Sequence, residues 1–188
     1  MGYNMRKGFT LIELVITMVI VGILSAAGVC VMLYLVQTSV FIPNKLNMDM
    51  LASGAMDTMI EGDGAAKGLR FSRVITTAQD NEIVFKDQSG QNIDYRLDTG
   101  ANKLYRSIGS VSGILPYYSS SSKIIVTGKD NKLFTYYDAS DAQMNNPVDP
   151  ANIRRIKITL IARTGSGSFE NWEGQSEQSS SIAVSKFE

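Results

Sequence analysis

Residues 9–36 read FTLIELVITMVIVGILSAAGVCVMLYLV, and this stretch decides the architecture of the N-terminal part of the chain. It holds 28 residues, and Glu13 is its single charged side chain. A helix on the surface of a soluble domain would show a polar stripe, and this stretch shows none. As a helix it would be about 42 Å long at ~1.5 Å per residue, more than the ~30 Å hydrocarbon core of a bilayer. The sequence therefore predicts a transmembrane helix over residues 9–36.

The charges that flank the apolar stretch predict its orientation. Arg6 and Lys7 precede it, and the next charged residue after Glu13 is Lys45. Because the cytoplasmic flanks of membrane spans carry an excess of cations, the N-terminus is expected in the cytoplasm. The chain is then a single-pass membrane protein, with everything after residue 36 on the other side.

Two kinds of N-terminal processing compete with this interpretation. A secretory signal peptide would share the cations and the apolar run, and Ser25-Ala26-Ala27 would serve as its cleavage site. A lipoprotein would be acylated at Cys30. However, the apolar run continues through VCVMLYLV, and Val29 is too bulky for the position before an acylated cysteine. Neither is favoured, and Cys30 is interpreted as a small hydrophobic side chain that faces lipid.

The string KGFTLIEL at residues 7–14 resembles the processing motif of type IV prepilins and type II secretion pseudopilins. The resemblance implies that residues 1–8 form a basic leader, which a prepilin peptidase removes after Gly8. It also implies that the new N-terminal residue, Phe9, becomes N-methylated.

The same resemblance implies where the protein works and with what. It assigns the charge of the leader to Arg6 and Lys7. It implies storage in the lipid of the bacterial inner membrane, followed by a place in a periplasmic or extracellular filament. The implied partners are the prepilin peptidase and other minor and major pilins or pseudopilins. The implied role is structural, without catalysis or a cofactor.

The position of Glu13 within the apolar stretch is unfavourable, because placing an acidic side chain in the middle of a membrane helix costs ~2.5–3.5 kcal/mol of free energy. Cleavage after Gly8 would create a partner, since a free α-amino group has an ordinary pKa near ~8 and is cationic at neutral pH. The resemblance implies that Glu13 of one subunit neutralises the Phe9 amine of its neighbour during assembly. Alternatively, Glu13 stabilises the start of its own helix through the macrodipole, worth ~0.3–1 kcal/mol. The two roles are compatible.

The helix is expected to continue over residues 37–62 as an amphipathic segment. Pro43 is expected to bend it, because proline removes a backbone donor, and the string Glu61-Gly62-Asp63-Gly64 is expected to end it. Apolar side chains at spacings of three and four predict a stripe buried beneath a sheet, in preference to a groove for a partner. The stripe consists of Met48, Leu51, Ala52, Ala55, Met56 and Met59.

Residues 63–188 are predicted to form a β-rich domain outside the cytoplasm, because the hydrophobic period becomes alternating after Gly64. The first predicted strands form a meander, and two later ones form a hairpin around Lys129-Asp130-Asn131. Residues 138–150 and the Gly/Ser-rich residues 164–180 are predicted loops. The predicted strands cover 82–87, 92–97, 102–107, 123–128, 133–138, 153–163 and, at an edge, 181–187. A long helix followed by antiparallel strands is α+β, in agreement with the pilin-like fold that the resemblance implies.

The succession of strands also resembles the larger minor pseudopilins, the J-type of type II secretion, and similar minor pilins. This resemblance implies a subunit at or near the filament tip, which starts assembly or contacts cargo. Two alternatives stay open. One is a minor pilin of a DNA-uptake or adhesive pilus, and the other is a signal-anchored extracytoplasmic binding domain. The chain has a single cysteine, so the β-rich domain is expected to fold without an intrachain disulfide.

The composition offers little for catalysis or metal binding. Histidine is absent, which removes the commonest general base and zinc ligand, and neither an enzyme activity nor a metal is predicted. Asp138, Asp141 and Asp149 would suit calcium by residue type. Their spacing matches no known calcium loop, and a solvated acidic loop is favoured.

No nucleic-acid partner is expected. The chain has 18 cations and 18 anions, and removing the residues before position 37 leaves 16 and 17, a net charge of −1. Non-specific DNA binding depends on many phosphate contacts, so a near-neutral domain should bind DNA weakly. Four cations on one predicted strand are interpreted as a solvated face: Arg154, Arg155, Lys157 and Arg163. The aromatic pair Phe169 and Trp172 is interpreted either as holding a loop against the domain or as a contact for a partner protein.

Overall fold

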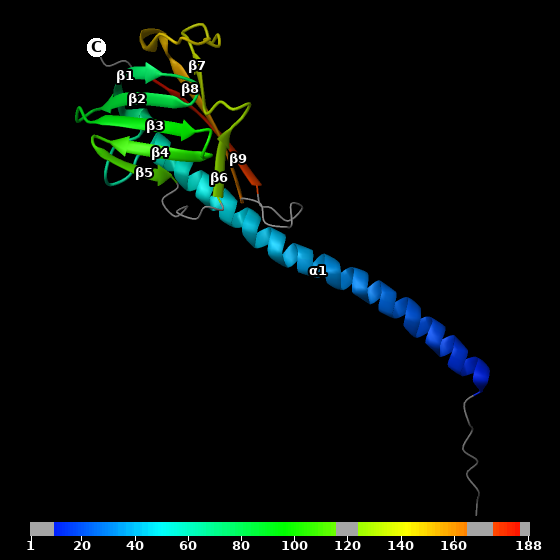
Figure 1. Ribbon diagram of the computed structural model, residues 1–188. Helices are drawn as coiled ribbons and strands as arrows, with labels where there is room; N and C mark the ends of the chain where they lie inside the picture. Colours follow the sequence, from blue (N-terminus) through cyan, green and yellow to red (C-terminus); the bar gives the residue numbers. More distant parts are fainter. Residues whose placement is uncertain (1–9, 116–123, 165–174, 185–188) are drawn as a thin grey trace, which may run out of the picture. The chain divides into compact units, whose positions relative to one another are not determined.

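The computed structural model describes residues 10–115, 124–164 and 175–184. The chain forms two compact units, Met1–Val40 and Phe41–Glu188. A single helix, α1 (Leu11–Ile60), begins in the first unit and ends in the second (Figure 1). The helix is continuous through Pro43, and the bend predicted there stays a prediction.

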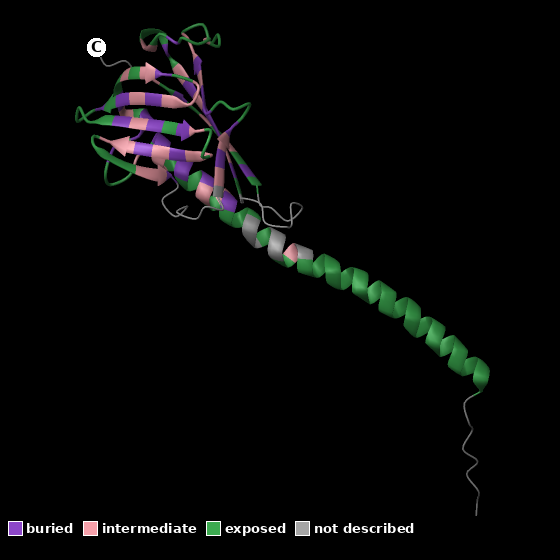
Figure 2. Ribbon diagram, in the orientation of Figure 1, coloured by how far each residue is buried: buried purple, intermediate pink, exposed green. Residues whose placement is uncertain are grey.

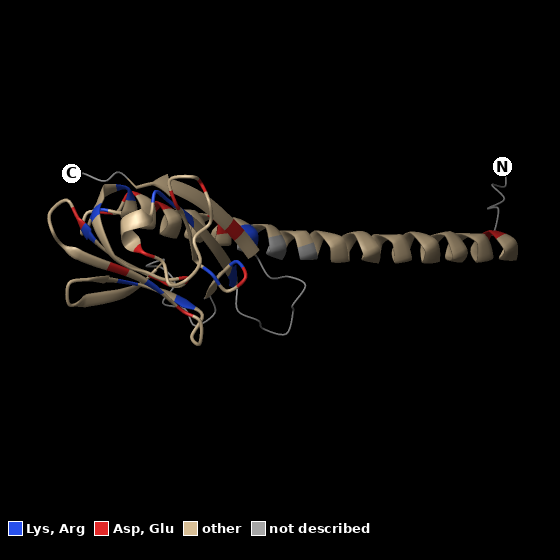
Figure 3. Ribbon diagram, turned by 90° about the horizontal axis from the view of Figure 1, so that it is seen from above, with Lys and Arg blue, Asp and Glu red and all other residues tan. Residues whose placement is uncertain are grey.

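The first unit consists, in its described part, of the apolar half of α1. Residues Leu11–Val36 form a helix long and apolar enough to cross a membrane, and none of this segment is buried by the rest of the chain (Figure 2). Glu13 is the charged residue at its beginning, and no other charge follows along this segment (Figure 3). A surface this apolar is stable only in lipid or against other apolar surfaces.

The second unit uses the last turns of α1 as one wall of its core. Met48, Ala52, Ala55 and Met59 recur at spacings of three and four, and each is at most 1% exposed. The alanines let the backbone of the sheet approach the helix closely, and the methionines fill the irregular space beside them. The predicted buried stripe is therefore confirmed.

The helix ends as its glycines predict. Ile60 is the last helical residue, and Gly62 has φ +87°, a conformation that favours glycine. The chain then turns back tightly, because Gly62 forms a bridge with Lys67. A Cβ on Gly68 would collide with the carbonyl of Ile60, so this close approach also requires glycine.

Five strands form an antiparallel meander in the order β1-β2-β3-β4-β5. A short 3₁₀ turn, η1 (Leu69–Phe71), leads into it. Its inward face carries the large buried side chains Ile83, Phe85, Ile93, Tyr95 and Leu104, all fully buried. The strands are β1 (Ser72–Ala78), β2 (Glu82–Asp87), β3 (Asn92–Asp98), β4 (Lys103–Ile108) and β5 (Val111–Leu115).

The second sheet is built around its longest strand, β8. The 3₁₀ turn η2 (Pro150–Asn152) precedes β8. Along β8, Ile158 pairs with Phe134 and Ser180, and Leu160 pairs with Gly128 and Gln178. β9 therefore follows one edge of β8, while β6 and β7 share the other edge. The strands are β6 (Ile124–Gly128), β7 (Phe134–Tyr137), β8 (Arg155–Thr164) and β9 (Gln175–Ala183).

The hairpin predicted around Lys129-Asp130-Asn131 is wrong. A tight excursion does occur there, since Asp130 and Asn131 have φ of +55° and +61° and Lys129 forms a bridge with Lys132. The chain then continues in its original direction, so β6 and β7 pair with β8 instead of with each other. Alternation shows which face of a strand is buried, but it does not identify the neighbouring strand.

Three further strand assignments needed correction. β1 and β5 were not predicted, and β9 begins at Gln175 within the predicted Gly/Ser-rich loop. Ser176 and Ile182 of β9 are buried, at 3% and 4% exposed. The serines between them are small and polar, so the sequence shows almost no alternation between apolar and polar side chains. The remaining predicted strands are confirmed to within two residues. The α+β class with antiparallel sheets packed on the helix is confirmed as well.

Candidate functional site: the start of the apolar helix

Of the residues predicted to guide processing and assembly, Glu13 is the one that the structure describes. Arg6, Lys7, Gly8 and Phe9 lie outside the described residues. Glu13 is in the first turn of α1, on a segment whose neighbouring side chains Leu11 and Leu14 are 83% and 50% exposed.

Thr10 and Glu13 form a capping box at the start of α1. The backbone N–H and the hydroxyl of Thr10 both donate to Glu13 Oε2, each across 3.0 Å. In return, the backbone N–H of Glu13 donates to Thr10 Oγ1 across 3.3 Å. The reciprocal pair satisfies backbone donors that no helical carbonyl can reach.

The capping box gives Glu13 a local role at its own helix terminus, through hydrogen bonds with Thr10 in place of the expected interaction with the macrodipole alone. The Thr-x-x-Glu spacing is visible in the sequence, and reading it as a capping signal would have identified Thr10 as the partner. Both hydrogen bonds from Thr10 go to Oε2. The printed hydrogen bonds to this carboxyl group thus leave its other oxygen, Oε1, for a further donor, and the pairing with Phe9 stays a prediction.

A second polar cluster, which the sequence analysis missed, lies where α1 ends. Arg106 on β4 is 5% exposed and donates from Nη2 to Asp63 Oδ2 across 2.8 Å. Asp63 Oδ1 accepts from the backbone N–H groups of Ala65 and Ala66. Arg106 is two residues after the buried Leu104 and therefore lies on the same, inward face of β4. This two-residue spacing in the sequence could have predicted that Arg106 is buried.

The pKa values of this cluster follow from its surroundings. Partial burial acts to raise the pKa of Asp63, but the hydrogen bonds from Ala65 and Ala66 and the charge of Arg106 outweigh it and lower the pKa. Burial raises the pKa of Tyr95 to about 12, although Arg106 opposes this. The Tyr95 hydroxyl donates to the carbonyl of Thr58 across 3.0 Å. The cluster thus ties the last turn of α1 to β3 and β4.

The three aspartates considered for calcium each have a separate local partner. Asp138 Oδ1 accepts from the backbone and the hydroxyl of Ser140. Asp141 pairs with Arg155, and Asp149 caps η2 by accepting from the N–H of Ala151. Within residues 10–115, 124–164 and 175–184, no group of three or more Cys, Asp or Glu side chains could hold a metal ion.

Two of the four cations on and beside β8, Arg154 and Arg155, have separate partners. Arg154 donates to the carbonyls of Ala151 and Ile153. The guanidinium of Arg155 lies 3.9 Å from the centre of the Tyr137 ring and pairs with Asp141. The predicted aromatic pair of Phe169 and Trp172 lies outside the described part of the chain.

Comparison with known proteins identifies the N-terminal segment. Residues 3–29 match the family model described as the prokaryotic N-terminal methylation motif. No curated protein and no solved structure matches the chain. The motif, the apolar helix and the antiparallel sheets fit a membrane-anchored subunit of pilin-like fold. The matched motif is that of type IV prepilins and pseudopilins, and it supports a pilin or pseudopilin subunit. The match ends at residue 29, so the J-type resemblance stays a prediction.

Proposed function

We propose that the chain is a minor pilin or pseudopilin, a structural subunit at or near the tip of a bacterial filament. The observation that carries this proposal is the apolar half of α1, which overlaps the matched methylation motif and is unburied within its own chain. Such a helix is compatible first with lipid and then with the apolar helices of other subunits.

Processing is the first step of the proposed function. A prepilin peptidase removes residues 1–8 after Gly8, and Phe9 becomes the methylated N-terminus in the inner membrane. The leader cations Arg6 and Lys7 hold the N-terminus in the cytoplasm. The β-rich unit then lies outside the cytoplasm, where its lack of a disulfide places no demand on the redox state.

Assembly is the second step. The charged amine of Phe9 pairs with Glu13 of the neighbouring subunit, so that neither charge enters the helix bundle alone. Thr10 supports this role, because its two hydrogen bonds hold the carboxylate at the helix terminus. The pairing partner of the amine is thus oriented before the subunits meet.

An exposed stripe in the second unit supports packing against a neighbouring helix. Ile42, Leu46 and Met50 recur every four residues along α1 and are 51%, 58% and 75% exposed. Gly54 continues the row, and nothing lies within 4 Å of the position where its Cβ would be. A row at four-residue spacing is one of the ridges by which helices pack against each other.

The experiment has two parts, because processing and tip position are separate claims. In a host with its own prepilin peptidase, the intact mass should correspond to a chain that begins at Phe9 and carries one methyl group. Replacing Gly8 with leucine should leave the leader attached. Immunogold labelling of sheared filaments should then mark their ends. Labelling along the whole filament would contradict the tip position, and a mass for cleavage after Ala27 would contradict the processing.

A further inference from the structure

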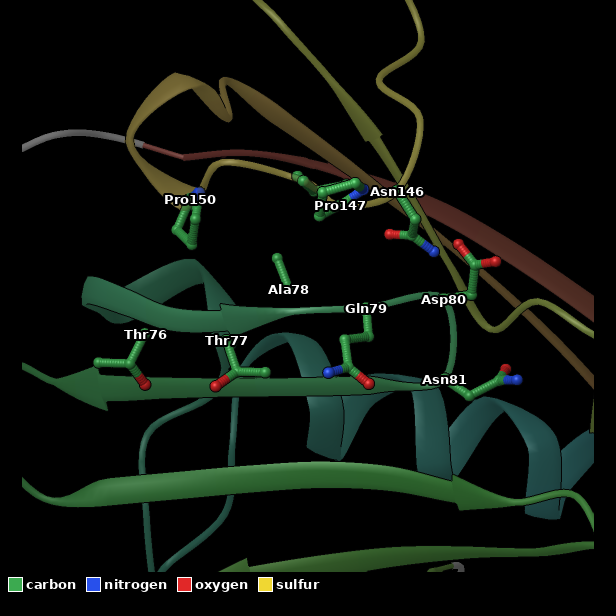
Figure 4. Close-up of a pocket in the computed structure, with 10 residues that line it drawn as sticks. Thr76, Thr77, Ala78, Gln79, Asp80, Asn81, Asn146, Pro147 and Pro150 are labelled. Carbon is green, nitrogen blue, oxygen red and sulfur yellow. The ribbon is translucent and has the colours of Figure 1, made fainter.

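A cleft of about 680 Å³ lies between the end of β1 and residues 146–150 (Figure 4). Ala78 at this edge is 7% exposed, and η2 already contacts β1. The chain therefore covers the edge of β1 itself. The outward side of α1 in the second unit is open instead, because nothing lies within 4 Å of the position where a Cβ on Gly54 would be.

An apolar row and then an acid follow one another along this outward side of α1. Ile42, Leu46 and Met50 form the row and are 51%, 58% and 75% exposed. Asp57 is exposed as well and lies seven residues after Met50. Seven residues make about two turns, so Asp57 is on the same side of the helix as Met50, ~10 Å further along the axis. The apolar row thus leads to a carboxylate.

The carboxylate of Asp57 is available to a partner. Within residues 10–115, 124–164 and 175–184, no ion pair or hydrogen bond holds it. Glu61, one turn further along α1, differs in this respect, since it pairs with Arg70 across 2.8 Å. Asp57 is therefore the acid beside the apolar row that has no cation of its own among these residues.

The helix surface between Met50 and Asp57 allows close approach. Ser53 and Gly54 lie there, and both are exposed. Small residues let the backbones of two helices come near each other. A partner helix that packs against the apolar row and continues for two further turns would then cover Asp57. Covering a carboxylate without a cation beside it is strongly unfavourable.

We propose that the outward side of α1 binds an amphipathic helix of another subunit, which carries a lysine or arginine at the level of Asp57. The inference rests on the proposed filament role and adds the chemistry of the partner to it. The apolar side chains of the partner pack against Leu46 and Met50, and its cation crosses Gly54 to pair with Asp57. Charge at the rim of an apolar contact selects one partner over others.

The helix of this chain lacks the matching cation. Lys45 is the only cation between Ile42 and Ile60 in the sequence. It precedes Met50 by five residues, which at ~3.6 residues per turn places it on a different side of the helix. Two copies anchored in one membrane lie parallel, so that Asp57 of one would meet Asp57 of the other. The partner is therefore a different subunit.

Photochemical cross-linking in a host that assembles the filament tests the proposal. Met50 of the full chain is replaced by p-benzoylphenylalanine, and irradiation of the cells joins it to the residue that it contacts. Mass spectrometry of the joined peptides then identifies the partner and the site of attachment. We expect an apolar stretch of another subunit, with a lysine or arginine within about two helical turns of that site.

Charge reversal tests the pairing itself. Asp57→Lys in the same background should lower the cross-linking yield about fivefold or more, because the two cations would repel each other. Asp57→Glu is the matched control and should leave the yield unchanged. Replacing the partner's identified cation with glutamate should restore the yield of Asp57→Lys. Circular dichroism should be the same for all these variants, since Asp57 is exposed and outside the core.

Any of three results would overturn the proposal. These are cross-linking mainly to a second copy of this chain, attachment to a stretch without a nearby cation, and equal yields from the wild type and Asp57→Lys. The intact mass of the same protein keeps the filament role separate. A chain processed to Phe9 that gives equal yields contradicts the charge pairing alone, whereas an unprocessed chain contradicts the filament role and this inference together.

Discussion

The guanidinium of Arg106 on β4 donates to the carboxylate of Asp63, in the loop that follows α1, across 2.8 Å. Arg106 is 5% exposed and the Asp63 side chain is 30% exposed, so the cation is almost entirely removed from water. The pair joins the loop after the helix to the fourth strand of the meander, across 43 residues of sequence. Its removal should therefore affect the whole unit.

Replacing Asp63 with alanine should destabilise the second unit by about 2–3 kcal/mol, below the ~3–5 kcal/mol of a fully buried pair. The cost arises because the charge of Arg106 stays buried without its carboxylate. Urea denaturation followed by circular dichroism measures it. The double variant Asp63→Ala/Arg106→Met should be more stable than Asp63→Ala alone, and an equal or lower stability would show that the pair is not the cause.

Stability should fall as the pH decreases below about 4. Burial acts to raise the pKa of Asp87, but hydrogen bonds from Ser89 and Gln91 outweigh it and the pKa is lowered, as it is for Asp63. A depressed folded pKa means that the stabilisation is complete above the unfolded pKa of ~3.9 and is lost as pH falls through the folded pKa. Urea midpoints at pH 7 and pH 3 measure the loss.

Asp87→Asn tests the source of that pH dependence. The variant should lose about 1–2 kcal/mol at pH 7, because hydrogen bonds to a charged acceptor are stronger than those to an amide. It should also show a smaller drop between pH 7 and pH 3 than the wild type. Asp57→Asn, on an exposed position of α1, is the control and should behave like the wild type at both pH values.

Glu13→Gln separates the two roles of the carboxylate. Glutamine can keep the capping box with Thr10 but carries no charge for the Phe9 amine. Glu13→Val removes both. If the charge pairing drives assembly, both variants should insert into the membrane at least as well as the wild type and join sheared filaments poorly. Normal co-purification of Glu13→Gln with filaments would leave Glu13 as a capping residue alone.

Leu46→Glu should reduce filament incorporation without unfolding the β-rich unit. Leu46 is 58% exposed in the middle of the Ile42, Leu46 and Met50 stripe, so a charge there costs little in the free subunit. In a helix bundle the same charge would be buried without a partner. Asn47→Glu, one position further around the helix, is the matched control. Equal incorporation of the two variants would show that the stripe does not face a neighbour.

Much of the architecture could be predicted from the chain because it depends on periodicity. The apolar run from residue 9 to residue 36 predicts a helix for lipid or for other apolar surfaces, and the stripe from Met48 to Met59 predicts one wall of a core. β2 was predicted over residues 82–87, and the structure has the same bounds. Its alternation is regular and its buried side chains are large.

The errors occur where the alternation is interrupted or carries no information on pairing. β1 contains two register shifts, and the consecutive residues Arg73 and Val74 are both exposed. The hydrophobic pattern of β1 therefore does not alternate as it does in a regular strand. The serines of β9 carry almost no hydrophobic contrast. The Thr10–Glu13 capping box was readable from its spacing. The Arg106–Asp63 pair was not, since its partners are 43 residues apart and nothing local links them.

The role of α1 as a wall of the core has a consequence for the order in which the protein matures. Met48 and Met59 are made early, whereas their core partners on β8, such as Ile156 and Leu160, are made about 100 residues later. Because the core needs both, the second unit cannot close until β8 has been synthesised. During that interval the methionine stripe is an uncovered apolar surface, and this is when the protein is most exposed to aggregation and proteolysis.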